Sequence, residues 1–533
     1  MPERRSYSPS ESTSDSPSTS TEALAGALSR PEAYPHGVDR VELRQTQMSL
    51  LFFSGDFVYK VKKPVNLGYL DYSTLEDRRR FCQREVELNR RLCPNTYLGV
   101  VPIAKGPKGV QVEGAGEVVE YAVKMRRLPP ERMLDRLLDN GLATREMMET
   151  ISARVAAFHA LAATTPEISA FGSIDTIRRN TDENFSQTLP NIARTVSSAT
   201  HALLRQYTDD FLDTQDALLS RRVHEGRIRD CHGDLHAAHI CMADEVCVYD
   251  CIEFNDRFRY GDVASETAFL AMDLDRFRRH DLSQAFIESY VAVSEDDGVS
   301  GLLPFYACYR AVVRGKVEGF KLGDTLIPEE ERLAAQWLAR TYFELAKRYA
   351  TGQGLLVVMS GLTASGKSTV ARRLGELVAG AVYSSDVVRK QLAGISPDEH
   401  RYESFGQGIY SPDWTQRTYE EMLRLAAEVL ASGGCAILDA SFLHAPERAR
   451  AVETARKASA RVMAIECAAP RETLLERLVE RRYAGSVSDG RPEILEGQLV
   501  NREPITEYAP RDHITVDTSR GIEALMEEIW AQL

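Results

Sequence analysis

The stretch LLVVMSGLTASGKS, from Leu355 to Ser368, constrains the fold of this chain more than any other feature. An apolar run reaches Gly361, and Gly366, Lys367 and Ser368 follow after four residues. This order is typical of a loop that joins a buried strand to a helix and turns backbone N–H groups toward a phosphate. We expect Lys367 to reach the outer phosphates and Ser368 to hold magnesium. The predicted phosphate-binding residues are Gly361, Leu362, Thr363, Ala364, Ser365, Gly366, Lys367, Ser368 and Thr369.

The alternative is a chance Gly/Ser turn after a buried strand. The residues after the loop disfavour it, because Val370, Leu374 and Leu377 recur with the spacing of an amphipathic helix.

Length and charge narrow the classes of protein that this chain can be. At 533 residues it is too long for one ordinary core, and its net charge of −13 disfavours general binding to nucleic acids or anionic membranes. No apolar run approaches the roughly eighteen residues of a membrane helix, and no apolar segment follows Arg4 and Arg5. We therefore expect a cytoplasmic protein, and the nine scattered cysteines fit a reducing compartment better than a disulfide framework.

Composition and periodicity divide the chain into three parts. Residues 6–21 are almost all Ser, Thr, Pro, Glu and Asp, which predicts a disordered tail. Strand-like alternation gives way to helical periodicity after Pro129 and Pro130, and Gly352 marks a second change. The predicted boundaries are a tail over 1–28, a first domain over 29–350 with lobes of about 35–127 and 128–350, and a last domain over 351–533.

The last domain alternates strands and helices. Apolar runs such as CAILDA and RVMAIEC are separated by helical stretches of ten or more residues. That alternation indicates a doubly wound parallel sheet, in which the strand ends line a ligand crevice.

Two polar residues follow the second strand of this sheet. Asp386 comes at the strand end, and Arg389 comes one helical turn later. Facing the crevice, Asp386 could accept a proton from a substrate hydroxyl, and Arg389 could hold an anionic group of the same substrate. The alternative is an N-capping Asp beside a surface Arg.

The next strand, CAILDA, ends on Asp439. An acidic residue at this place can order magnesium beside the phosphate loop. A buried strand that ends on an N-capping Asp would give the same pattern, so the interpretation depends on the loop.

Arg477 and Arg481 are spaced by one helical turn, directly before the Gly/Ser/Asp-rich stretch AGSVSDGRPE. A helix and loop of this kind suit a lid that brings cations over a transferred phosphoryl group. Ion pairing with Glu476 and Glu480 on a solvated face is the alternative.

The first domain carries a second set of candidate residues. Two strand runs around Gly55 and Asp56 predict a hairpin whose second strand places Lys60 and Lys62 on one face. Glu85, on a helix predicted over 75–92, is positioned to pair with one of these lysines.

Downstream of that helix, an HGD sequence (232–234) and an IEF sequence (252–254) supply Asp234 and Glu253. Phosphoryl transfer needs a lysine, a carboxylate base and oxygen ligands for magnesium, which these residues would provide. The alternative is solvated lysines on a hairpin and a turn without chemistry.

Histidines and cysteines gather between 231 and 251, with His232 and His236 in HxxxH spacing. They fall in a predicted loop and no CxxC pair accompanies them, so we favour coincidence over a zinc site.

Residues 35–345 resemble the aminoglycoside phosphotransferase branch of the kinase-like fold, which includes choline-kinase-like enzymes, in the strand lysine, the helix REVELNRRL, the HGD loop and the IEF segment. The resemblance implies Lys62 on the phosphates with Glu85 as its partner, Asp234 as catalytic base and Glu253 as metal ligand. The family usually has Asp as this metal ligand, and Asp250 lies three residues before Glu253. Where the family has a magnesium-binding Asn, five residues after the catalytic Asp, this chain has His239. Magnesium prefers hard oxygen ligands, so imidazole is a poor replacement.

Residues 352–533 look like the small P-loop kinases, the group with gluconate kinase, chloramphenicol phosphotransferase, zeta toxins and polynucleotide kinase. GLTASGKST, SSDVVRK, ILDASF and the arginine lid occur in the order of that group. The whole chain resembles bacterial fusions of an aminoglycoside-phosphotransferase-like domain with such a kinase. The resemblances imply an α+β, bilobal kinase-like fold followed by an α/β, parallel-sheet P-loop kinase fold.

These observations lead to one leading hypothesis and two alternatives. The leading hypothesis is an ATP- and Mg2+-dependent kinase that phosphorylates a hydroxyl of a small molecule at the phosphate loop, with the first domain as second kinase or substrate module. One alternative is a nucleotide-dependent regulatory switch with a degenerate first domain. The other is a polynucleotide 5′-hydroxyl kinase, which the acidic charge disfavours.

Overall fold

The computed structural model describes residues 20–325, 327–396, 407–484 and 492–533, with the side chains of 481–484, 492 and 493 left aside. These residues form two compact units. Unit 1 runs to Arg136 and adds residues 232–234 and 238–259, and unit 2 holds residues 137–231, 235–237 and 260–533. Helix α3 (Leu134–Asp139) crosses the boundary in sequence.

Unit 1 is built on a six-stranded antiparallel sheet in the order β1-β2-β3-β6-β4-β5. Its strands are β1 (Val41–Gln45), β2 (Ser49–Ser54), β3 (Phe57–Lys62), β4 (Tyr97–Gly106), β5 (Gly109–Val112) and β6 (Glu117–Arg126). Strands β2 and β3 pair around Gly55 and Asp56, as the sequence predicts. Hydrogen-bonded pairing places Ser49 opposite Lys62 and Leu51 opposite Lys60, which fixes the face that carries both lysines.

Helix α2 (Leu75–Asn89) covers one face of this sheet. Thr74 caps it by accepting a hydrogen bond from the backbone N–H of Asp77. Cys82 and Val86 are buried in an apolar cluster with Val58 and Val123 of the sheet, and this packing sets the depth at which Glu85 of the same helix is held. A small hairpin, β8 (Ile240–Met242) and β9 (Val246–Val248), and the short helix α9 (Asp256–Arg259) complete the unit.

The predicted tail over residues 1–28 needs correction at its end. Residues Thr21–Leu28 form helix α1, capped by Ser20. Leu24 and Leu28 are buried in the apolar cluster of the sheet, beside Phe52 and Tyr59. The apolar spacing of EALAGAL therefore stabilises a helix through contacts with a sheet that follows it in the chain. Residues 1–19 lie outside the described part.

Unit 2 contains a helical region and a parallel-sheet region. The helices of the first region are α4 (Arg145–Leu161), α5 (Pro166–Ser169), α6 (Ile174–Thr188), α7 (Ser198–Thr214), α8 (Asp216–His224), α10 (Val263–Arg276), α11 (His280–Ser294), α12 (Gly298–Lys321) and α13 (Glu329–Thr351). Strands β7 (Ile228–Asp230) and β10 (Tyr260–Asp262) pair beside them. Helix α10 is buried on nearly every side. Across the described ranges, none of the helices is both long enough and apolar enough to span a bilayer.

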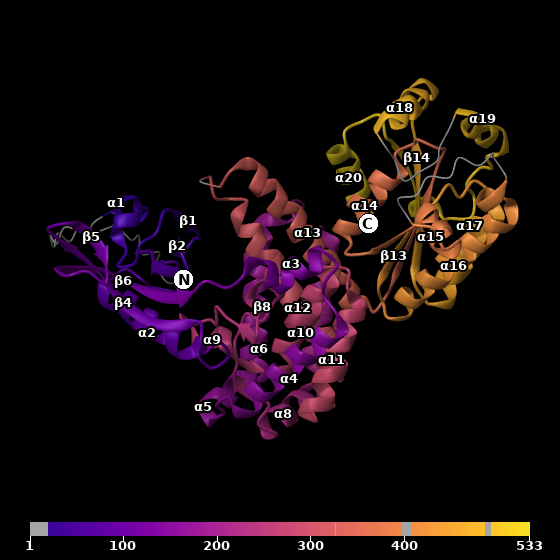
Figure 1. Cartoon of the computed structure of the whole chain (residues 1–533). Coiled ribbons are helices and arrows are strands. Elements are labelled where there is room, and N and C mark those ends of the chain that lie inside the picture. The colour runs from indigo at the N-terminus through magenta and orange to yellow at the C-terminus, as the bar shows by residue number, and fades with distance from the viewer. Residues whose placement is uncertain (1–19, 326, 397–406, 485–491) are drawn as a thin grey trace, which may run out of the picture. The chain divides into compact units, whose positions relative to one another are not determined.

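The second region is a five-stranded parallel sheet in the order β12-β13-β11-β14-β15, which confirms the predicted parallel sheet (Figure 1). Its strands are β11 (Leu355–Ser360), β12 (Ala381–Ser384), β13 (Cys435–Asp439), β14 (Arg461–Ala468) and β15 (His513–Asp517). Its helices are α14 (Lys367–Leu377), α15 (Ser385–Leu392), α16 (Pro412–Ala431), α17 (Ala445–Lys457), α18 (Arg471–Ala484), α19 (Pro492–Asn501) and α20 (Ile522–Trp530).

Helices cover both faces of this sheet, so its strands are apolar throughout. Helices α14 and α20 pack on one face through Val370, Leu374 and Met526. Helices α15, α16 and α17 pack on the other, where Met422 and Ala451 are fully buried. Figure 1 shows α14 and α20 on one side of the strands and α16 and α17 on the other.

One buried arginine anchors the segment between α19 and β15. Arg448 is fully buried on α17. Its guanidinium donates to both carboxylate oxygens of Glu507, at 2.8 and 3.0 Å, and to the carbonyls of Phe442 and Pro504. Paired burial of this kind is costly to disrupt, because the remaining partners lose their hydrogen bonds.

We expect Arg448→Met to lower the free energy of unfolding by about 3 kcal/mol, the range for breaking one side of a buried pair. The neighbouring Arg450→Met is the matched control: Arg450 lies 3.5 Å from Glu420 at the surface, and it should change stability by less than about 0.5 kcal/mol. Urea and thermal unfolding of both variants measure the difference. Equal midpoints for the two variants would show that the Arg448 network adds little.

Candidate active site

The phosphate loop joins β11 to α14, and its glycines take conformations that other residues avoid. Gly361 has φ +140° and Gly366 has φ +81°, while Ala364 adopts φ +61° without being glycine. A Cβ atom on Gly361 would lie 2.4 Å from the carbonyl oxygen of Cys467 and 2.8 Å from Oγ of Ser365. The loop is therefore packed too closely at Gly361 to accept a side chain.

We expect Gly361→Ala to destabilise the loop by at least about 2 kcal/mol through overpacking and to weaken nucleotide binding with it. Gly394→Ala is the matched control, since Gly394 also has a positive φ of +67° but has open space where a Cβ would stand. Thermal melting with and without ATP separates the two effects. A Gly361→Ala variant that melts and binds ATP like the Gly394→Ala variant would contradict this expectation.

Lys367 begins α14 and turns back over the loop. Its Nζ donates to the carbonyl oxygens of Gly361, at 3.0 Å, and Leu362, at 2.7 Å. The ammonium group is thus held within the loop, beside the N-terminus of α14.

Asp439 and Asp386 meet at the carboxyl edge of the sheet because of strand register. Asp439 pairs with Met359 of β11 and with Ser384 of β12, and Asp386 follows two residues after Ser384. Ser368, in the first turn of α14, lies beside Asp439 and influences the pKa of that carboxyl group. Burial raises the pKa of Asp439, and the nearby charge of Asp386 raises it further, whereas Ser368 lowers it.

Arg389 lies on the same helix, α15, one turn beyond Asp386. It is 7% exposed, and its Nη1 lies 3.9 Å from Oδ1 of Asp386. Its guanidinium stands over the ring of Tyr410 at 4.8 Å, and its Nε has no hydrogen-bond partner in the described part of the chain. A buried guanidinium with an unused donor can bind an anionic group.

Helices α18 and α19 pack onto the phosphate loop. Leu474, Leu478 and Leu495 form an apolar cluster with Leu362 and Ala364 of the loop. This cluster holds α18 and α19 against the phosphate loop, which is where the predicted lid should lie.

Two polar side chains of these helices contact the loop backbone or its neighbours. Arg477 on α18 donates to the carbonyl of Ala364, at 3.4 Å, and to Thr518, at 3.2 and 2.5 Å. Gln498 on α19 accepts a hydrogen bond from the backbone N–H of Thr363, at 2.7 Å. The side chain of Arg481 and most of the stretch AGSVSDGRPE lie outside the described residues.

The residues at the loop fit a nucleotide with magnesium. Ser365 Oγ is buried in the loop without a hydrogen-bond partner among the described residues. Ser368 and Asp439 offer adjacent oxygen ligands of the kind that magnesium prefers. The backbone N–H groups of the loop and Lys367 would hold the phosphates.

In unit 1 the predicted lysine and glutamates are in direct contact. Nζ of Lys62, 1% exposed, donates to Glu85, at 2.6 Å, and to Glu253. The hydroxyl of Tyr72 donates to the same Glu253 oxygen, at 2.6 Å. Burial lowers the pKa of Lys62, but the charges of Glu253 and Glu85 outweigh it and raise that pKa well above its usual value. The carboxylate of Glu253 thus accepts hydrogen bonds from two residues of unit 1, Lys62 and Tyr72.

The second lysine of β3 belongs to the same network. Nζ of Lys60 lies 2.9 Å from Oε1 of Glu85 and 2.5 Å from Oδ1 of Asp250. Glu85 thus bridges both lysines, and Asp250 joins the network from the segment after β9.

His239, at the position where the resemblance implies Asn, lies between two aspartates of unit 1. Its Nδ1 is 3.0 Å from the carbonyl oxygen of Asp234 and 3.4 Å from the Asp234 carboxylate. Its Nε2 is 3.7 Å from Oδ2 of Asp250. The structure therefore brings Asp250, rather than Glu253, to His239.

Comparison with known proteins shows which family this chain belongs to. Residues 356–505 match the family model described as an AAA domain. Over 455 residues the chain is 32% identical to uncharacterized proteins of Mycobacterium tuberculosis and Mycobacterium bovis, which covers 85% of this chain and 88% of each relative. The chain belongs to the family of these mycobacterial proteins. The AAA-domain match spans the phosphate loop, Asp386, Asp439 and Arg477.

Three solved structures show weak similarity to parts of this chain. A gluconokinase from Sinorhizobium meliloti is 20% identical and covers 33% of this chain and 89% of its own, with a TM-score of 0.24. The Mycobacterium tuberculosis APS kinase in complex with AMPPNP and APS is 20% identical, with coverages of 34% and 97% and a TM-score of 0.26. A choline/ethanolamine kinase family protein from Mesorhizobium loti is 13% identical, with coverages of 62% and 98% and a TM-score of 0.36. At such scores these likenesses have no bearing on the activity of this family member.

The cysteines of this family member depart from the expectation of free thiols in one place. Cys93, after α2, and Cys247, in β9, form a disulfide with their Cα atoms 4.8 Å apart. The other cysteines of the described part are buried and form no disulfide. Cys247 is therefore not a thiolate metal ligand in this structure.

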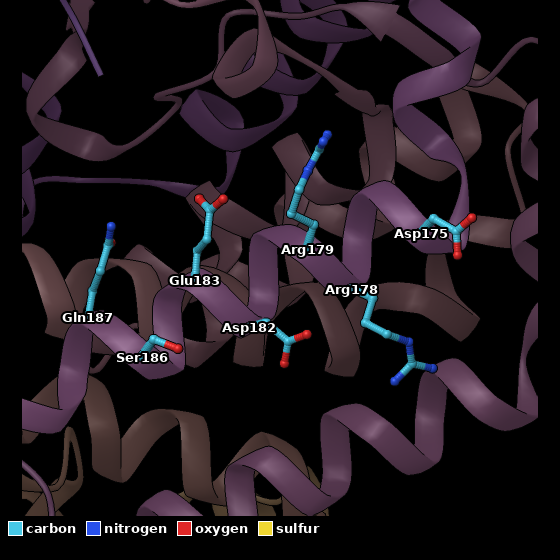
Figure 2. A pocket seen from close by; sticks show the side chains of 7 residues that line it. All are labelled: Asp175, Arg178, Arg179, Asp182, Glu183, Ser186 and Gln187. Carbon is cyan, nitrogen blue, oxygen red and sulfur yellow. The ribbon is translucent and has the colours of Figure 1, made fainter. Parts of the chain in front are cut away.

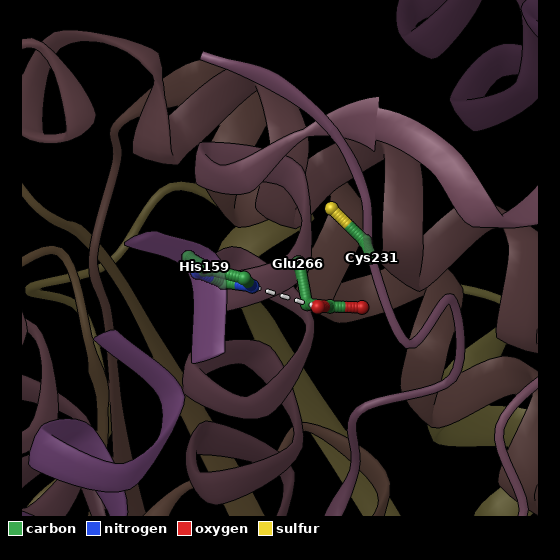
Figure 3. Close-up of side chains that lie close together, drawn as sticks. All are labelled: His159, Cys231 and Glu266. Carbon is green, nitrogen blue, oxygen red and sulfur yellow. Dashed lines mark hydrogen bonds and ion pairs between the residues drawn. The ribbon is translucent and has the colours of Figure 1, made fainter. Parts of the chain in front are cut away.

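One buried cluster of metal-binding residue types lies in unit 2, formed by His159, Cys231 and Glu266 (Figure 3). Nε2 of His159 is 2.8 Å from the Glu266 carboxylate, and its Nδ1 is 2.8 Å from the hydroxyl of Tyr290. Both ring nitrogens are thus engaged in hydrogen bonds. We interpret the cluster as a buried polar contact that ties α4 to α10 and α11.

A shallow pocket on helix α6 is built mainly from charged side chains (Figure 2). Its lining residues are Asp175, Arg178, Arg179, Asp182, Glu183, Ser186 and Gln187. Arg178 pairs with Asp209 and Asp213 of α7, and Asp182 pairs with Arg205. Exposed pairs of this kind are ordinary surface features, so we assign no site here.

Several residues near the two sites were not identified from the sequence. They are Tyr72, Tyr410, Gln498 and Thr518. These four have no spacing or motif that links them to the loop or the lysines, because long-range packing brings them there. Asp250 is different, since the sequence already offers it as an alternative to Glu253 three residues later.

Proposed function

We propose that this chain is a magnesium-dependent ATP phosphotransferase that phosphorylates a hydroxyl of a small molecule at the phosphate-loop site. The observation that carries the proposal is the convergence of Ser368, Asp439 and Asp386 at the carboxyl edge of one parallel sheet. A nucleotide site alone needs the first two groups. A carboxylate placed beside them, at a second strand end, adds a group that can take a proton.

The transfer step assigns each proton and bond to a group on the chain. Asp386 accepts the proton of the acceptor hydroxyl while the oxygen of that hydroxyl bonds to the γ-phosphorus of ATP. The bond between the γ-phosphorus and the bridging oxygen breaks, and ADP leaves. Lys367 and the backbone N–H groups of the loop hold the phosphates throughout.

Arg477 and Gln498 support the lid interpretation of α18 and α19. Both side chains hydrogen-bond at or beside the loop, and the leucines beneath them pack on Leu362 and Ala364. A lid that rests on the loop can exclude water from the transfer step, which favours transfer to the acceptor over ATP hydrolysis.

The role we propose for unit 1 is a second transfer site or a substrate-selecting module. The contact of Lys62 with Glu85 supports a phosphate-binding role for the lysine, and Asp234 would be the base. The hydrogen bonds of Glu253 to Lys62 and Tyr72 do not favour the metal role implied for it, so no step is assigned to a metal at that residue.

The test is product formation by the full-length chain. ATP and magnesium are supplied with a panel of polyols, sugar acids, amino alcohols and aminoglycosides, and mass spectrometry looks for a gain of one phosphoryl group. We expect one chemical class to be phosphorylated with matching ADP release. ATP binding without any phosphorylated product across the panel and in cell extract would favour the regulatory alternative instead.

A further inference from the structure

The polar groups around His239 in unit 1 do not fit the magnesium ion that the kinase-like resemblance implies. Magnesium needs octahedral oxygen ligands, and the carboxylate of Glu253 is engaged by Lys62 and Tyr72. The position at which the resemblance implies an oxygen ligand holds an imidazole instead, His239, and the carboxylate of Asp250 lies 3.7 Å from its Nε2. A nitrogen donor beside a carboxylate suits a different class of metal.

The orientation of His239 is fixed by a backbone acceptor. Its Nδ1 lies 3.0 Å from the carbonyl oxygen of Asp234, and because a carbonyl can only accept, the proton of a neutral ring stands on Nδ1. The lone pair of that ring is then on Nε2, which faces Asp250. Histidines that bind metals commonly donate their other ring N–H to a carbonyl in this way.

The other carboxylate oxygen of Asp250 is held by a lysine. Lys60 donates to its Oδ1 at 2.5 Å, while its Oδ2 faces His239. Asp250 has φ +64°, a left-handed conformation that Asp tolerates better than most non-glycine residues. Its side chain is 39% exposed, so an ion can reach it from solvent.

The separation of the two donor atoms matches shared coordination. Donors that each bind one Zn2+ ion at about 2.1 Å with tetrahedral angles lie about 3.4 Å apart. Nε2 of His239 and Oδ2 of Asp250 are 3.7 Å apart, so a shift of a few tenths of an ångström would complete the pair.

We propose that His239 and Asp250 bind one divalent transition-metal ion of the Zn2+ or Co2+ type in preference to Mg2+. Two protein ligands leave the remaining coordination positions to water or to a phosphate oxygen. The site is built from residues of unit 1, whereas the phosphate loop belongs to unit 2, and the proposal does not depend on the function proposed for that loop.

The rival explanation is a protonated His239 that forms ion pairs with Asp234 and Asp250. This arrangement needs no metal and would use the same distances. Metal-binding measurements separate the two explanations, because an imidazolium between two carboxylates repels a divalent cation.

The experiment uses the full-length chain with Asp439→Asn, which weakens the expected metal site at the phosphate loop, in a buffer without nucleotide. Calorimetry measures the affinity for Zn2+ and Mg2+, and the absorption spectrum of added Co2+ reports its ligands. Three further substitutions are compared in this background: His239→Asn, Asp250→Asn and His224→Asn. His224 is an exposed histidine of α8 and is the control.

We expect one Zn2+ ion per chain that excess Mg2+ does not displace. His239→Asn should weaken Zn2+ binding at least about 10-fold while Mg2+ becomes an effective competitor, because Asn supplies an oxygen donor. Asp250→Asn should weaken both metals, and His224→Asn should change neither. The proposal is overturned if Zn2+ binding survives His239→Asn unchanged, or if the chain with His239 prefers Mg2+. Melting curves of each variant show whether it is folded.

Discussion

Lys367→Ala lowers ATP-dependent phosphorylation by at least about 100-fold, the range for losing one group that stabilises developing charge in a transition state. The reason is geometric, because Nζ of Lys367 is held inside the loop by the carbonyls of Gly361 and Leu362. From this position the ammonium group can contact the outer phosphates of a bound nucleotide. The measurement is initial-rate ADP release with and without acceptor.

The control for this variant is Lys457→Ala. Lys457 ends α17 and pairs with Glu453 in an exposed i,i+4 ion pair, so its loss should leave turnover unchanged. If Lys367→Ala keeps full turnover, the phosphate loop is not the transfer site. In that case unit 1 would be examined next through Lys62 and Asp234.

Asp386→Asn should lower the turnover number by about 100-fold or more, which is the usual contribution of a general base. The amide has nearly the same shape as the carboxylate but cannot accept the proton. Nucleotide affinity should change little, since Ser368 and Asp439 remain in place. Turnover kinetics and calorimetric titration of a non-hydrolysable ATP analogue measure the two quantities separately.

Asp413→Asn is the matched control for this second prediction. Asp413 also stands in the first turn of a helix, α16, but it is exposed. If Asp386→Asn leaves turnover intact while ATP still changes protease sensitivity, the chain acts as a nucleotide-dependent switch. Loss of both turnover and ATP binding would instead show that Asp386 is needed to build the site.

The last domain was predictable because its signals are local. The spacing from Gly361 to Ser368 fixes a loop between strand and helix, and apolar runs of five or so residues fix the strands on either side. Once strands and helices alternate, a parallel sheet follows, and its strand ends come to one edge. For this reason the sequence could name Asp386 and Asp439 as neighbours of the loop before their register was known.

The first domain was less predictable because its contacts join distant segments. Strand alternation and helix position could pair Glu85 with one of the two lysines of β3, and the structure shows that it contacts both Lys60 and Lys62. The choice between Asp250 and Glu253 at His239 could not be made from the sequence, since both are acidic and only three residues apart. Asp250, at a turn with positive φ, has its carboxylate near Lys60 and His239. The carboxylate of Glu253 instead accepts hydrogen bonds from Lys62 and Tyr72.

Two corrections have the same physical origin. Residues 21–28 were assigned to a polar tail, but the sheet of unit 1 buries Leu24 and Leu28 and so stabilises α1. Cys93 and Cys247 are 154 residues apart in sequence, and only the packing of the segment after α2 beside β9 brings them into a disulfide. Neither contact can be predicted from the local secondary-structure propensity of the residues involved.

The phosphate loop, the parallel sheet and the residue types around the loop could all be inferred from the sequence, because each depends on spacings of a few residues. Which of those groups come into contact depends on the tertiary structure. The tertiary structure brings Ser368 beside Asp439 and lets Arg477 and Gln498 hydrogen-bond to the backbone of the loop. It also places His239 near Asp250. The physical reason is packing. Burial in a close-packed interior fixes how deep a side chain lies and where it points, and spacing along the sequence does not specify either.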